Sequence, residues 1–553
     1  MNKKINARTI SLVLIFILIL ITIALLIGKF TYSYLAPTID DDVEGAGEVT
    51  ASGDTIIFTK GNTLSLSANT DNFKTGGSNL TATTNPKVKL MASSKAESAS
   101  SKYFAGVIIK NNTYTYTTTD KKAEVILTVK DENGNIVETS SDNLKFVTVN
   151  NNLKGFDITG VNGAFNIVTD HIIATSSNKS EVIHTWTFTL TFVNLGTDQS
   201  NNENSTLNID VVLQKDKIPT TIADFCGNGD NLGNCIVNYY NGLNTASNIY
   251  YHDANLTNGA GDNSYRYAGA REAVNNYVCF GSNVTPCPAD NLYRIIGVFG
   301  DRVKLIKSDY ATTALLGADG DYSKMYTANN WDNSAYKGNN LANIAGYTWN
   351  YKNNTSINNG YGSNTWSTSL LNKTNLNKNF ITNIGADWAA KIDMTTWKVG
   401  GNTWANIGTK PAKTAYQNEI VNPVTTNSQD NKTEYSAKIG LMYASDYGFA
   451  AAPSAWTANL NTYNGEAIKN VNWMYMGLVE WTISRDAGYS NLAFYVNNAG
   501  NVNSSSVGSN AFGVRPVFYL SSSVNYASGS GTAADPISIN WLMDSFEKAS
   551  PLT

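Results

Sequence analysis

Charged residues are scarce in this chain. Asp, Glu, Lys and Arg make up 15% of its 553 residues, against about 25% in typical globular proteins. Neither sign dominates, because 40 basic and 44 acidic residues leave a formal net charge of -4. A nucleic-acid-binding protein would carry a basic stripe or patch. The composition therefore argues against nucleic acid as a partner.

Histidine, a common metal ligand, is nearly absent. The chain has only His171, His184 and His252, and their spacing matches no metal-binding motif. We therefore expect no metal site, and we expect each ring to lie in a core or on the surface. The sequence also contains no complete catalytic set, so we expect a protein that is not an enzyme.

Cysteine is confined to one short part of the chain, and none precedes Cys226. The spacings of Cys226, Cys235, Cys279 and Cys287 are too wide for C-x-x-C redox or zinc motifs. In a protein that lies outside the cell, an even number of cysteines favours disulfides, and four cysteines allow three connectivities. Pairing of neighbours is the simplest, because each pair brackets a turn region rich in Gly, Asn or Pro. The alternative, a reactive thiol, lacks a basic neighbour or a helix N-terminus.

A single uncharged hydrophobic run, Ile10–Gly28, is long enough to cross a membrane. It spans about 28 Å at about 1.5 Å per residue. Three basic residues precede it, and Lys29 and an acidic patch follow it, so the positive-inside rule predicts a cytoplasmic N-terminus and an extracellular bulk. A cleaved signal peptide is the alternative, although its apolar region is normally about 7–15 residues. We favour an uncleaved, single-pass anchor in the cell membrane. The C-terminal KASPLT carries no hydrophobic tail or wall-sorting signal.

Shifts in composition divide the chain into segments. We expect a basic cytoplasmic tail (1–9), the anchor (10–28), a linker (29–49), a β-sandwich stalk (50–214), a boundary linker (215–220), a disulfide-containing lead-in (221–290), a second module (291–540) and a tail (541–553).

The expected stalk consists of short strand-like segments. They alternate apolar with polar residues or are β-branched runs, and turn signals such as Gly61-Asn62 and residues 132–135 separate them. Examples are FAGVIIK (104–110), TYTYTTT (113–119) and HTWTFTLTFVNL (184–195). Many short strands with polar turns predict a β-sandwich. We expect a spacer without chemistry, with an adhesive or self-assembling role as the alternative.

The second module begins with a hairpin. Leu292–Phe299 and Arg302–Ser308 are β-runs joined by Gly300-Asp301. Residues 329–365 are rich in Asn, Gly and Trp and predict a loop. Residues 366–384 have apolar side chains mostly four apart, which predicts a helix that ends at Gly385.

The stretch 472–520 is dense in aromatic residues, with Gly477 and Gly513 as expected turning points. The order of hairpin, W-x-x-S-L-L-N helix, G-L-V-E-W (477–481) and G-V-R-P (513–516) resembles formylglycine-generating enzymes, also called sulfatase-modifying factors. That family carries G-N-V-W-E-W and, some thirty residues later, G-F-R. The resemblance covers roughly residues 250–540. It implies an α+β, C-type-lectin-like module in a surface protein of a Gram-positive bacterium. The expected fold is thus multidomain and β-rich, with an N-terminal transmembrane helix and a β-sandwich before this module.

One departure from the family pattern matters for activity. The enzymes carry a reactive cysteine pair between the two motifs, whereas Thr482–Phe512 contains no cysteine. Oxidation of that type therefore lacks its nucleophile and metal ligands. We expect a non-catalytic, adhesin-like module that binds carbohydrate or protein. A structural wall or matrix component, assembled through the β-sandwich, is the alternative, and a cryptic enzyme of the sulfatase-modifying type is a weaker one.

The resemblance also assigns framework residues. We expect a structural role for Trp473, Glu480, Trp481, Arg515 and Pro516. By the family pattern Glu480 is a hydrogen-bond partner, Trp481 lies in the core and Arg515 is a buried ion-pair anchor, and a Glu480–Arg515 pair is a further hypothesis. The alternative for Glu480 is a ligand contact or a calcium ligand. Residues 317–321 (GADGD) also hint at calcium but fail the EF-hand pattern, so a plain turn is favoured. We expect no cofactor, with calcium as the possible exception.

The best candidate recognition surface is the polar run 489–509. Tyr offers contact area at low entropy cost, and Asn and Ser offer adaptable hydrogen bonds. The alternative is a polar hairpin without a partner. Aromatic residues from the preceding loop would add stacking faces for sugar rings. The candidate ligand-binding residues are Tyr489, Asn491, Tyr495, Asn497, Asn498, Trp349 and Tyr361.

Overall fold

The structure is a computed structural model and describes residues 46–541, except for 52–53, 69–76, 94–97, 143, 151, 177–179, 326–334, 340, 352–361 and 427–431. The expected anchor, Ile10–Gly28, lies outside the described residues. None of the helices that the structure describes is both long and apolar enough to cross a membrane. The chain separates into two units, Met1–Ala46 and Gly47–Thr553. Strands account for 36% and helices for 19%, so the protein is β-rich, as the sequence predicts.

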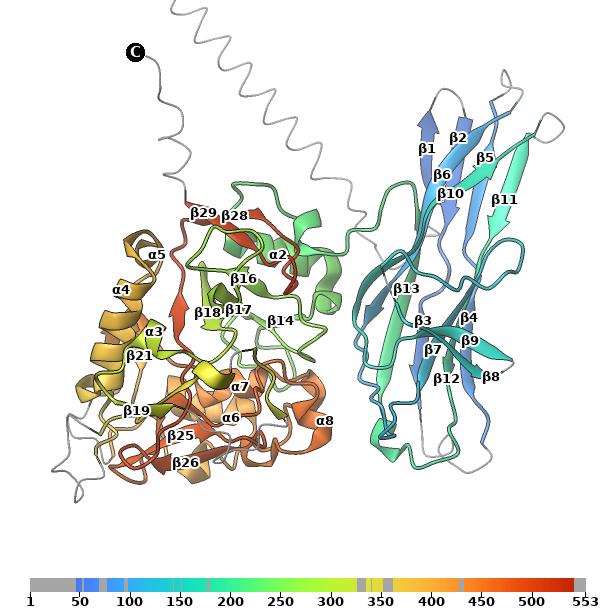
Figure 1. Cartoon of the computed structure of the whole chain (residues 1–553). Helices are drawn as coiled ribbons and strands as arrows, with labels where there is room; N and C mark the ends of the chain where they lie inside the picture. Colours follow the sequence, from blue (N-terminus) through green and yellow to red (C-terminus); the bar gives the residue numbers. More distant parts are fainter. Residues whose placement is uncertain are drawn as a thin grey trace, which may run out of the picture. The chain divides into compact units, whose positions relative to one another are not determined.

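Residues 46–214, the N-terminal region, contain three sheets (Figure 1). The first has the order β1 (Ala46–Ala51), β2 (Asp54–Thr59), β5 (Lys87–Met91), β11 (Glu181–Thr185). The second has the order β10 (Gly163–Ala174), β6 (Ser100–Lys110), β13 (Thr206–Gln214), β3 (Leu64–Ser67). The third has the order β4 (Leu80–Thr84), β12 (Thr187–Phe192), β7 (Val125–Lys130), β9 (Leu153–Asp157), β8 (Phe146–Asn150).

All three sheets contribute to one hydrophobic core. Ile56 of β2, Val107 of β6 and Leu127 of β7 are buried in the same cluster. The alternating burial along β13, in which every second side chain is buried, is the period of two that a half-buried strand requires. The apolar positions that alternate along this strand in the sequence are therefore the positions that the core buries.

One predicted strand is wrong. Residues 113–119 (TYTYTTT) alternate well but form no strand. Side chains satisfy their backbone instead, since the Thr115 N–H donates to Asn202 Oδ1 at 2.8 Å and the Thr117 N–H donates to Glu124 Oε1 at 2.7 Å. Glu124 and Asn202 are buried. These side-chain acceptors take the place of a neighbouring strand.

Residues 215–541, the C-terminal region, are built on a seven-stranded sheet (Figure 1). Its order is β14 (Ile249–His252), β15 (Ser264–Tyr267), β17 (Leu292–Phe299), β18 (Arg302–Lys307), β27 (Val517–Tyr519), β23 (Ile439–Gly440), with β16 (Tyr277–Cys279) paired to β17. The hairpin predicted at Gly300-Asp301 is confirmed as β17–β18, and Gly300 has φ +65.

Smaller sheets and short helices surround this sheet. The sheets are β19 (Tyr322–Met325) with β20 (Ala345–Tyr347), β21 (Thr395–Lys398) with β22 (Glu434–Ala437), β24 (Glu480–Arg485) with β25 (Leu492–Val496) and β26 (Val502–Ser506), and β28 (Val524–Ser528) with β29 (Ser538–Trp541). The α-helices are α2 (Leu232–Leu243), α3 (Thr313–Leu316), α4 (Ile381–Asn383), α5 (Ala386–Ala390), α6 (Ala412–Tyr416), α7 (Ala444–Phe449) and α8 (Glu466–Lys469).

The predicted helix at 366–384 is present with an irregular interior. A short 3-10 turn (Trp366–Thr368) is followed by wide turns over Leu371–Phe380 and then by α4. Gly385, with φ +85, comes directly after the C-cap residue Ile384, as expected for a helix stop. Residues 329–365, predicted to be a loop, contain the strand β20, which pairs with β19. This pairing uses backbone groups, so the side-chain pattern does not reveal it.

Candidate functional site

Two disulfides lie in the C-terminal region. Cys226 pairs with Cys235 at a Cα–Cα distance of 5.4 Å, and Cys279 pairs with Cys287 at 5.9 Å. Both distances suit a disulfide. The pairing of neighbours expected from the sequence is confirmed.

A hollow of about 750 Å³ lies beside the Cys279–Cys287 loop. Four separate segments line it: the loop with Asn228 and Gly229, the disulfide loop, the β28–β29 hairpin and Trp388 of α5. Most of its described polar lining is amide or hydroxyl: Asn228, Ser282, Asn283, Thr285, Asn525, Ser528, Ser538 and Asn540. Among the described lining residues only Asp535 carries a charge. We call this hollow the disulfide-loop groove.

Backbone hydrogen bonds hold the walls of the disulfide-loop groove together. The Cys279 N–H donates to Ile537 O at 2.9 Å, and the Ile537 N–H donates to Tyr277 O at 2.9 Å. On the other side, Asn540 Nδ2 donates to Asn228 Oδ1 at 2.8 Å. The loop and the hairpin are thus fixed to each other before any ligand arrives.

Uncharged groups make up most of the lining of the disulfide-loop groove. The half-buried ring of Trp388 packs edge-on against Phe280, with centroids 5.0 Å apart. Asp535 Oδ2 accepts from the Ser530 N–H at 2.8 Å, and both cysteines are in a disulfide. No His, Lys or Glu belongs to the described lining. This arrangement can offer hydrogen bonds and one aromatic ring, but it does not offer an activated nucleophile.

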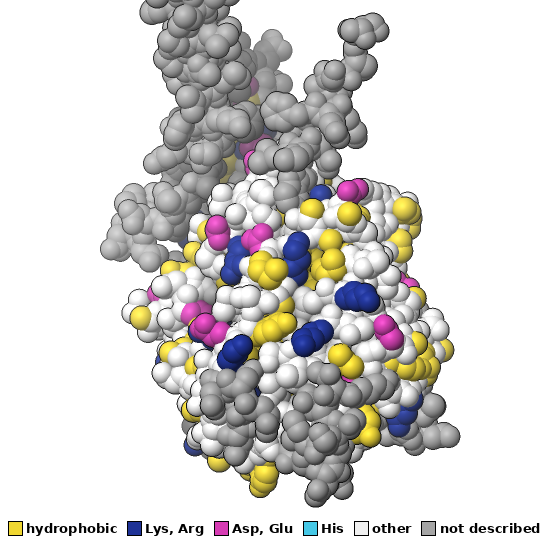
Figure 2. All heavy atoms as spheres, turned by 90° about the vertical axis from the view of Figure 1, so that its left-hand side faces the viewer, with side chains coloured by type: hydrophobic (Ala, Val, Ile, Leu, Met, Phe, Trp, Pro, Cys, Tyr) yellow, Lys and Arg dark blue, Asp and Glu magenta, His cyan; other side chains and the backbone are white. Residues whose placement is uncertain are grey.

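The face drawn in Figure 2 is also largely uncharged among the described residues. Figure 2 shows one face on which uncharged polar atoms predominate and on which Lys and Arg are interspersed with Asp and Glu. A single-sign patch of the kind that recognises polyanions is not present on that face among the residues described. This agrees with the composition.

The predicted recognition surface around 489–509 is only partly exposed. Tyr489 is 61% exposed, whereas Asn491, Tyr495, Asn497 and Asn498 are half-buried. Asn497 Oδ1 accepts from the N–H groups of Ala499 and Asn501, so it shapes the turn between β25 and β26. None of these residues lines the disulfide-loop groove.

The assignment of Trp349 as a stacking face is wrong. Its ring is fully buried, its Nε1 donates to Thr482 O at 2.9 Å, and its centroid lies 4.8 Å from that of Trp366. Burial of so large an apolar ring stabilises the core more than an exposed position would. Tyr361 lies outside the described residues.

The two framework motifs, 477–481 and 513–516, meet in the structure. Arg515 Nε and Nη2 each donate to a carboxylate oxygen of Glu480, both at 2.7 Å, and Nη2 also donates to Met474 O. Both side chains are 1% exposed. Burial raises the pKa of Glu480, and Arg515 opposes this rise. With both of its oxygens engaged, Glu480 serves the framework rather than a ligand.

The neighbouring framework residues are also internal. Trp473 Nε1 donates to Tyr267 O and Trp481 Nε1 donates to Tyr347 O, both at 2.8 Å. Pro516 O accepts from the Lys307 N–H at 3.0 Å, which places the second motif beside the central sheet. Asp321 of the GADGD turn is buried, and its carboxylate accepts from the N–H groups of Leu370 and Leu371.

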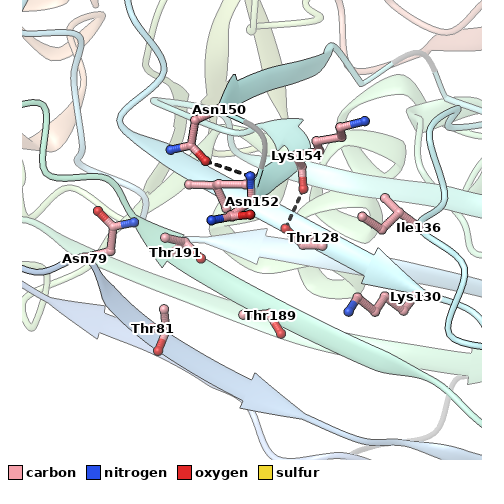
Figure 3. A pocket seen from close by; sticks show the side chains of 11 residues that line it. Asn79, Thr81, Thr128, Lys130, Ile136, Asn150, Asn152, Lys154, Thr189 and Thr191 are labelled. Atoms are coloured by element: carbon pink, nitrogen blue, oxygen red, sulfur yellow. Dashed lines mark hydrogen bonds between the residues drawn. The ribbon is translucent and has the colours of Figure 1, made fainter.

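A second hollow, of about 710 Å³, lies over the third sheet of the N-terminal region (Figure 3). Threonines 81, 128, 189 and 191 line it together with Lys130 and Lys154. Thr128 Oγ1 donates to Lys154 O at 2.7 Å, and the Asn152 N–H donates to Asn150 Oδ1 at 2.9 Å. Its described lining contains no aromatic ring, so the disulfide-loop groove is the better candidate for a site.

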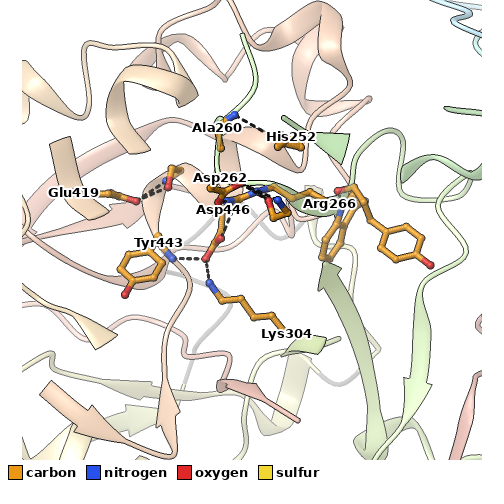
Figure 4. A network of polar contacts seen from close by, with 12 residues as sticks. His252, Ala260, Asp262, Arg266, Lys304, Glu419, Tyr443 and Asp446 are labelled. Atoms are coloured by element: carbon orange, nitrogen blue, oxygen red, sulfur yellow. Dashed lines mark hydrogen bonds and ion pairs between the residues drawn. The ribbon is translucent and has the colours of Figure 1, made fainter. Parts of the chain in front are cut away.

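A buried ionic network surrounds Asp446 of α7 (Figure 4). Asp446 contacts Lys304 Nζ at 2.5 Å and Arg266 Nη1 at 3.4 Å, and it accepts from the Tyr443 N–H at 3.0 Å. Arg266 also pairs with Asp262 at 2.6 Å. Two cations and two anions balance, as buried charges require. The sequence analysis missed this network because its members come from three segments that are far apart in the chain.

Glu419 lies near this network without joining it (Figure 4). Its carboxyl oxygens accept from the Ser445 N–H, Ser445 Oγ and Ser484 Oγ at 2.9, 2.7 and 3.0 Å. Burial raises the pKa of Glu419 to about 7. Burial also lowers the pKa of His252 well below its usual value. Neither residue lines either hollow, so these shifts describe the core.

No protein-family model, curated protein or solved structure matches the chain.

Proposed function

We propose that this chain is a membrane-anchored extracellular surface protein whose C-terminal region binds neutral carbohydrate in the disulfide-loop groove. The observation that carries the proposal is the lining of that groove, in which amide and hydroxyl groups from three segments surround the ring of Trp388. Sugar hydroxyls pair with amide groups, and the apolar face of a sugar ring packs on an aromatic side chain.

The size of the groove favours a small ligand over a protein surface. Its volume of about 750 Å³ lies within the range of about 300–1,000 Å³ that is typical of small-molecule pockets. A protein partner would instead need roughly 800 Å² of contact surface on this chain. The absence of charge in the described lining, apart from Asp535, argues for a neutral glycan rather than an acidic one.

The same proposal covers location and architecture. Ile10–Gly28 is the membrane anchor, with the N-terminus in the cytoplasm. The two disulfides support an extracellular position, because such bonds persist in oxidising compartments. The N-terminal region is a β-sandwich stalk, and the C-terminal region has a C-type-lectin-like fold. The Glu480–Arg515 pair, which joins the two framework motifs, supports this fold.

A glycan array with the full chain in detergent tests the proposal. We expect saturable binding to neutral glycans, weakened at least about tenfold in Trp388→Ala, since a central aromatic contact commonly contributes about 2 kcal/mol or more. Trp404→Ala is the matched control, because Trp404 is 38% exposed and does not line the groove. Equal binding by both variants, or no glycan binding by the wild-type chain, would refute the proposal.

A second candidate function is assembly through the N-terminal region. Ile172 of β10 is 59% exposed and Ile183 of β11 is 49% exposed, and each strand is an edge of its sheet. Exposed edges with apolar side chains favour pairing with another chain. Filaments of the purified chain that disappear in Ile172→Lys/Ile183→Lys would support this candidate. A strictly monomeric chain at high concentration would exclude it.

A further inference from the structure

Two histidines and a glutamate converge in the N-terminal region. Glu132 lies in the turn after β7, His171 lies on β10 and His184 lies on β11. One ligand atom from each residue lies within 4.8 Å of the other two. Among the residues that the structure describes, this is the only group of three His, Cys, Asp or Glu side chains with such spacing. The linear spacing of the histidines does not predict this meeting.

The distances fit a small metal ion. His171 Nε2 lies 3.0 Å from Glu132 Oε2, and His184 Nδ1 lies 3.9 Å from the same oxygen. In a tetrahedral zinc site with bonds of about 2.0–2.1 Å, neighbouring ligand atoms are about 3.3 Å apart. The two measured distances bracket that value, so small side-chain rotations suffice to close the site.

A hydrogen-bond chain behind the site fixes the tautomer of His184, and an ion at Nδ1 would have to displace its last bond. Trp186 Nε1 donates to Tyr103 Oη at 2.8 Å, and Tyr103 Oη lies 2.9 Å from His184 Nδ1. Because the Tyr103 oxygen accepts from Trp186, its own O–H can donate to Nδ1. The Nδ1 lone pair then points at Tyr103 Oη and the ring proton lies on Nε2. A metal ion would replace the Tyr103 proton as the partner of this lone pair.

Aromatic packing fixes the other ring. The centroid of His171 lies 5.0 Å from that of Trp186 and 5.3 Å from that of Tyr103, both edge-on. Tyr103 and Trp186 are fully buried. The side chains of the three candidate ligands are partly exposed: His171 by 22%, His184 by 12% and Glu132 by 19%. An ion can therefore reach them from solvent. A rigid base with an open side suits a three-ligand site that keeps one position for water.

We propose that Glu132, His171 and His184 bind one divalent transition-metal ion, with zinc as the first candidate. The ligand set of two imidazoles and one carboxylate also suits other first-row ions, but zinc needs no redox partner and accepts four-coordinate geometry. The bound ion would connect the turn after β7 to β10 and β11. Its role in a stalk would be to stabilise the fold of these segments.

The experiment is a titration of the purified full chain with Zn²⁺ alone, followed by calorimetry, and with Co²⁺ alone, followed by visible absorption. The variants are Glu132→Gln, His171→Gln and His184→Gln. The matched control is Asp170→Asn. The Asp170 side chain is 60% exposed, and its carboxylate is next to His171 in sequence but is not a candidate ligand. Circular dichroism and the melting temperature without metal confirm that each variant folds.

We expect one ion per wild-type chain and a tetrahedral Co²⁺ spectrum. Each ligand variant should bind at least about tenfold more weakly, and Asp170→Asn should bind as the wild-type chain does. Zinc should raise the melting temperature of the wild-type chain and the control only. The proposal is overturned if the wild-type chain shows no saturable binding, if Glu132→Gln and Asp170→Asn bind alike, or if Co²⁺ gives an octahedral spectrum.

Discussion

Glu419 should make the stability of the C-terminal region depend on pH near neutrality. This carboxyl is 1% exposed and receives its hydrogen bonds from Ser445 and Ser484, which are neutral. Burial raises its pKa from 4.5 to about 7. Because the folded-state pKa exceeds the unfolded value, the folded state keeps a proton that the unfolded chain releases. The protonated carboxyl therefore stabilises the fold fully below about pH 4.5, and this contribution is lost as the pH rises through about 7.

The magnitude follows from the size of the shift. A rise of about 2.5 units corresponds to about 3 kcal/mol between the two limits, at about 1.4 kcal/mol per unit. Between about pH 5 and pH 8 the linkage relation predicts a loss of about 2.5 kcal/mol in the free energy of unfolding. Since a whole domain is stable by only about 5–15 kcal/mol, this loss is large enough to measure.

Glu419→Gln isolates this contribution. The amide is neutral at every pH, its oxygen can accept from the Ser445 N–H, and its NH₂ can donate to Ser484 Oγ. Urea unfolding, followed by tryptophan fluorescence at several pH values, gives the free energy of unfolding of both proteins. The variant should gain about 2.5 kcal/mol relative to wild type between about pH 5 and pH 8. The buried His252 is present in both proteins, so its effect cancels in the difference.

Glu466→Gln is the control, because the Glu466 side chain is 74% exposed and its pKa lies below the usual value through its hydrogen bond with Lys469. That variant should follow the wild-type curve throughout this pH range. The reasoning is refuted if the difference between Glu419→Gln and wild type stays constant with pH, or if it falls as the pH rises.

Three further predictions concern the framework of the C-terminal region. Arg515→Met should lower the free energy of unfolding in urea by about 3–5 kcal/mol, because it leaves Glu480 buried without its partner. The double variant Glu480→Leu/Arg515→Met should lose less, and a larger loss in the double variant would contradict the pairing. Replacing Cys279 and Cys287 with serine should lower the free energy of unfolding by about 2.5 kcal/mol in the same assay, because the unfolded loop is no longer cross-linked. The double substitution should also weaken glycan binding, because the loop forms one wall of the groove. Unchanged binding would count against that wall as a contact. Gly477→Ala should lower the free energy of unfolding by roughly 1–3 kcal/mol, since Gly477 has φ +83 and a Cβ there would lie 2.1 Å from a backbone carbonyl oxygen. An unchanged melting temperature would contradict this expectation and show that the turn can rearrange.

Short-range features were predictable because their causes are local. Gly300-Asp301 alone favours the turn between β17 and β18. The two disulfides close loops of 9 and 8 residues in sequence separation, so nearest neighbours meet with little chain entropy lost. The Glu480–Arg515 pair was expected only through the motif resemblance. Nothing in the spacing of these two residues by itself brings them together.

Longer-range errors have equally specific causes. The alternation in 113–119 satisfies the pattern of a strand, but Glu124 and Asn202 supply the hydrogen-bond acceptors that a neighbouring strand would otherwise provide. Trp349 lies in a polar stretch that predicts an exposed loop, yet β20, just before it, carries it into the core. In both cases partners distant in sequence outweigh the local preference.

The sequence by itself determined the β-rich character, the β17–β18 hairpin, the disulfide pairing and the scarcity of charge. Each of these depends on composition or on residues close together in the chain. Only the tertiary structure decided that the disulfide loop, Trp388 and the β28–β29 hairpin share one groove, and that Glu132, His171 and His184 meet. Those sites are formed by segments far apart in the chain that strand pairing and core packing bring together, and the side-chain pattern of each segment indicates its own secondary structure but not which segment becomes its neighbour.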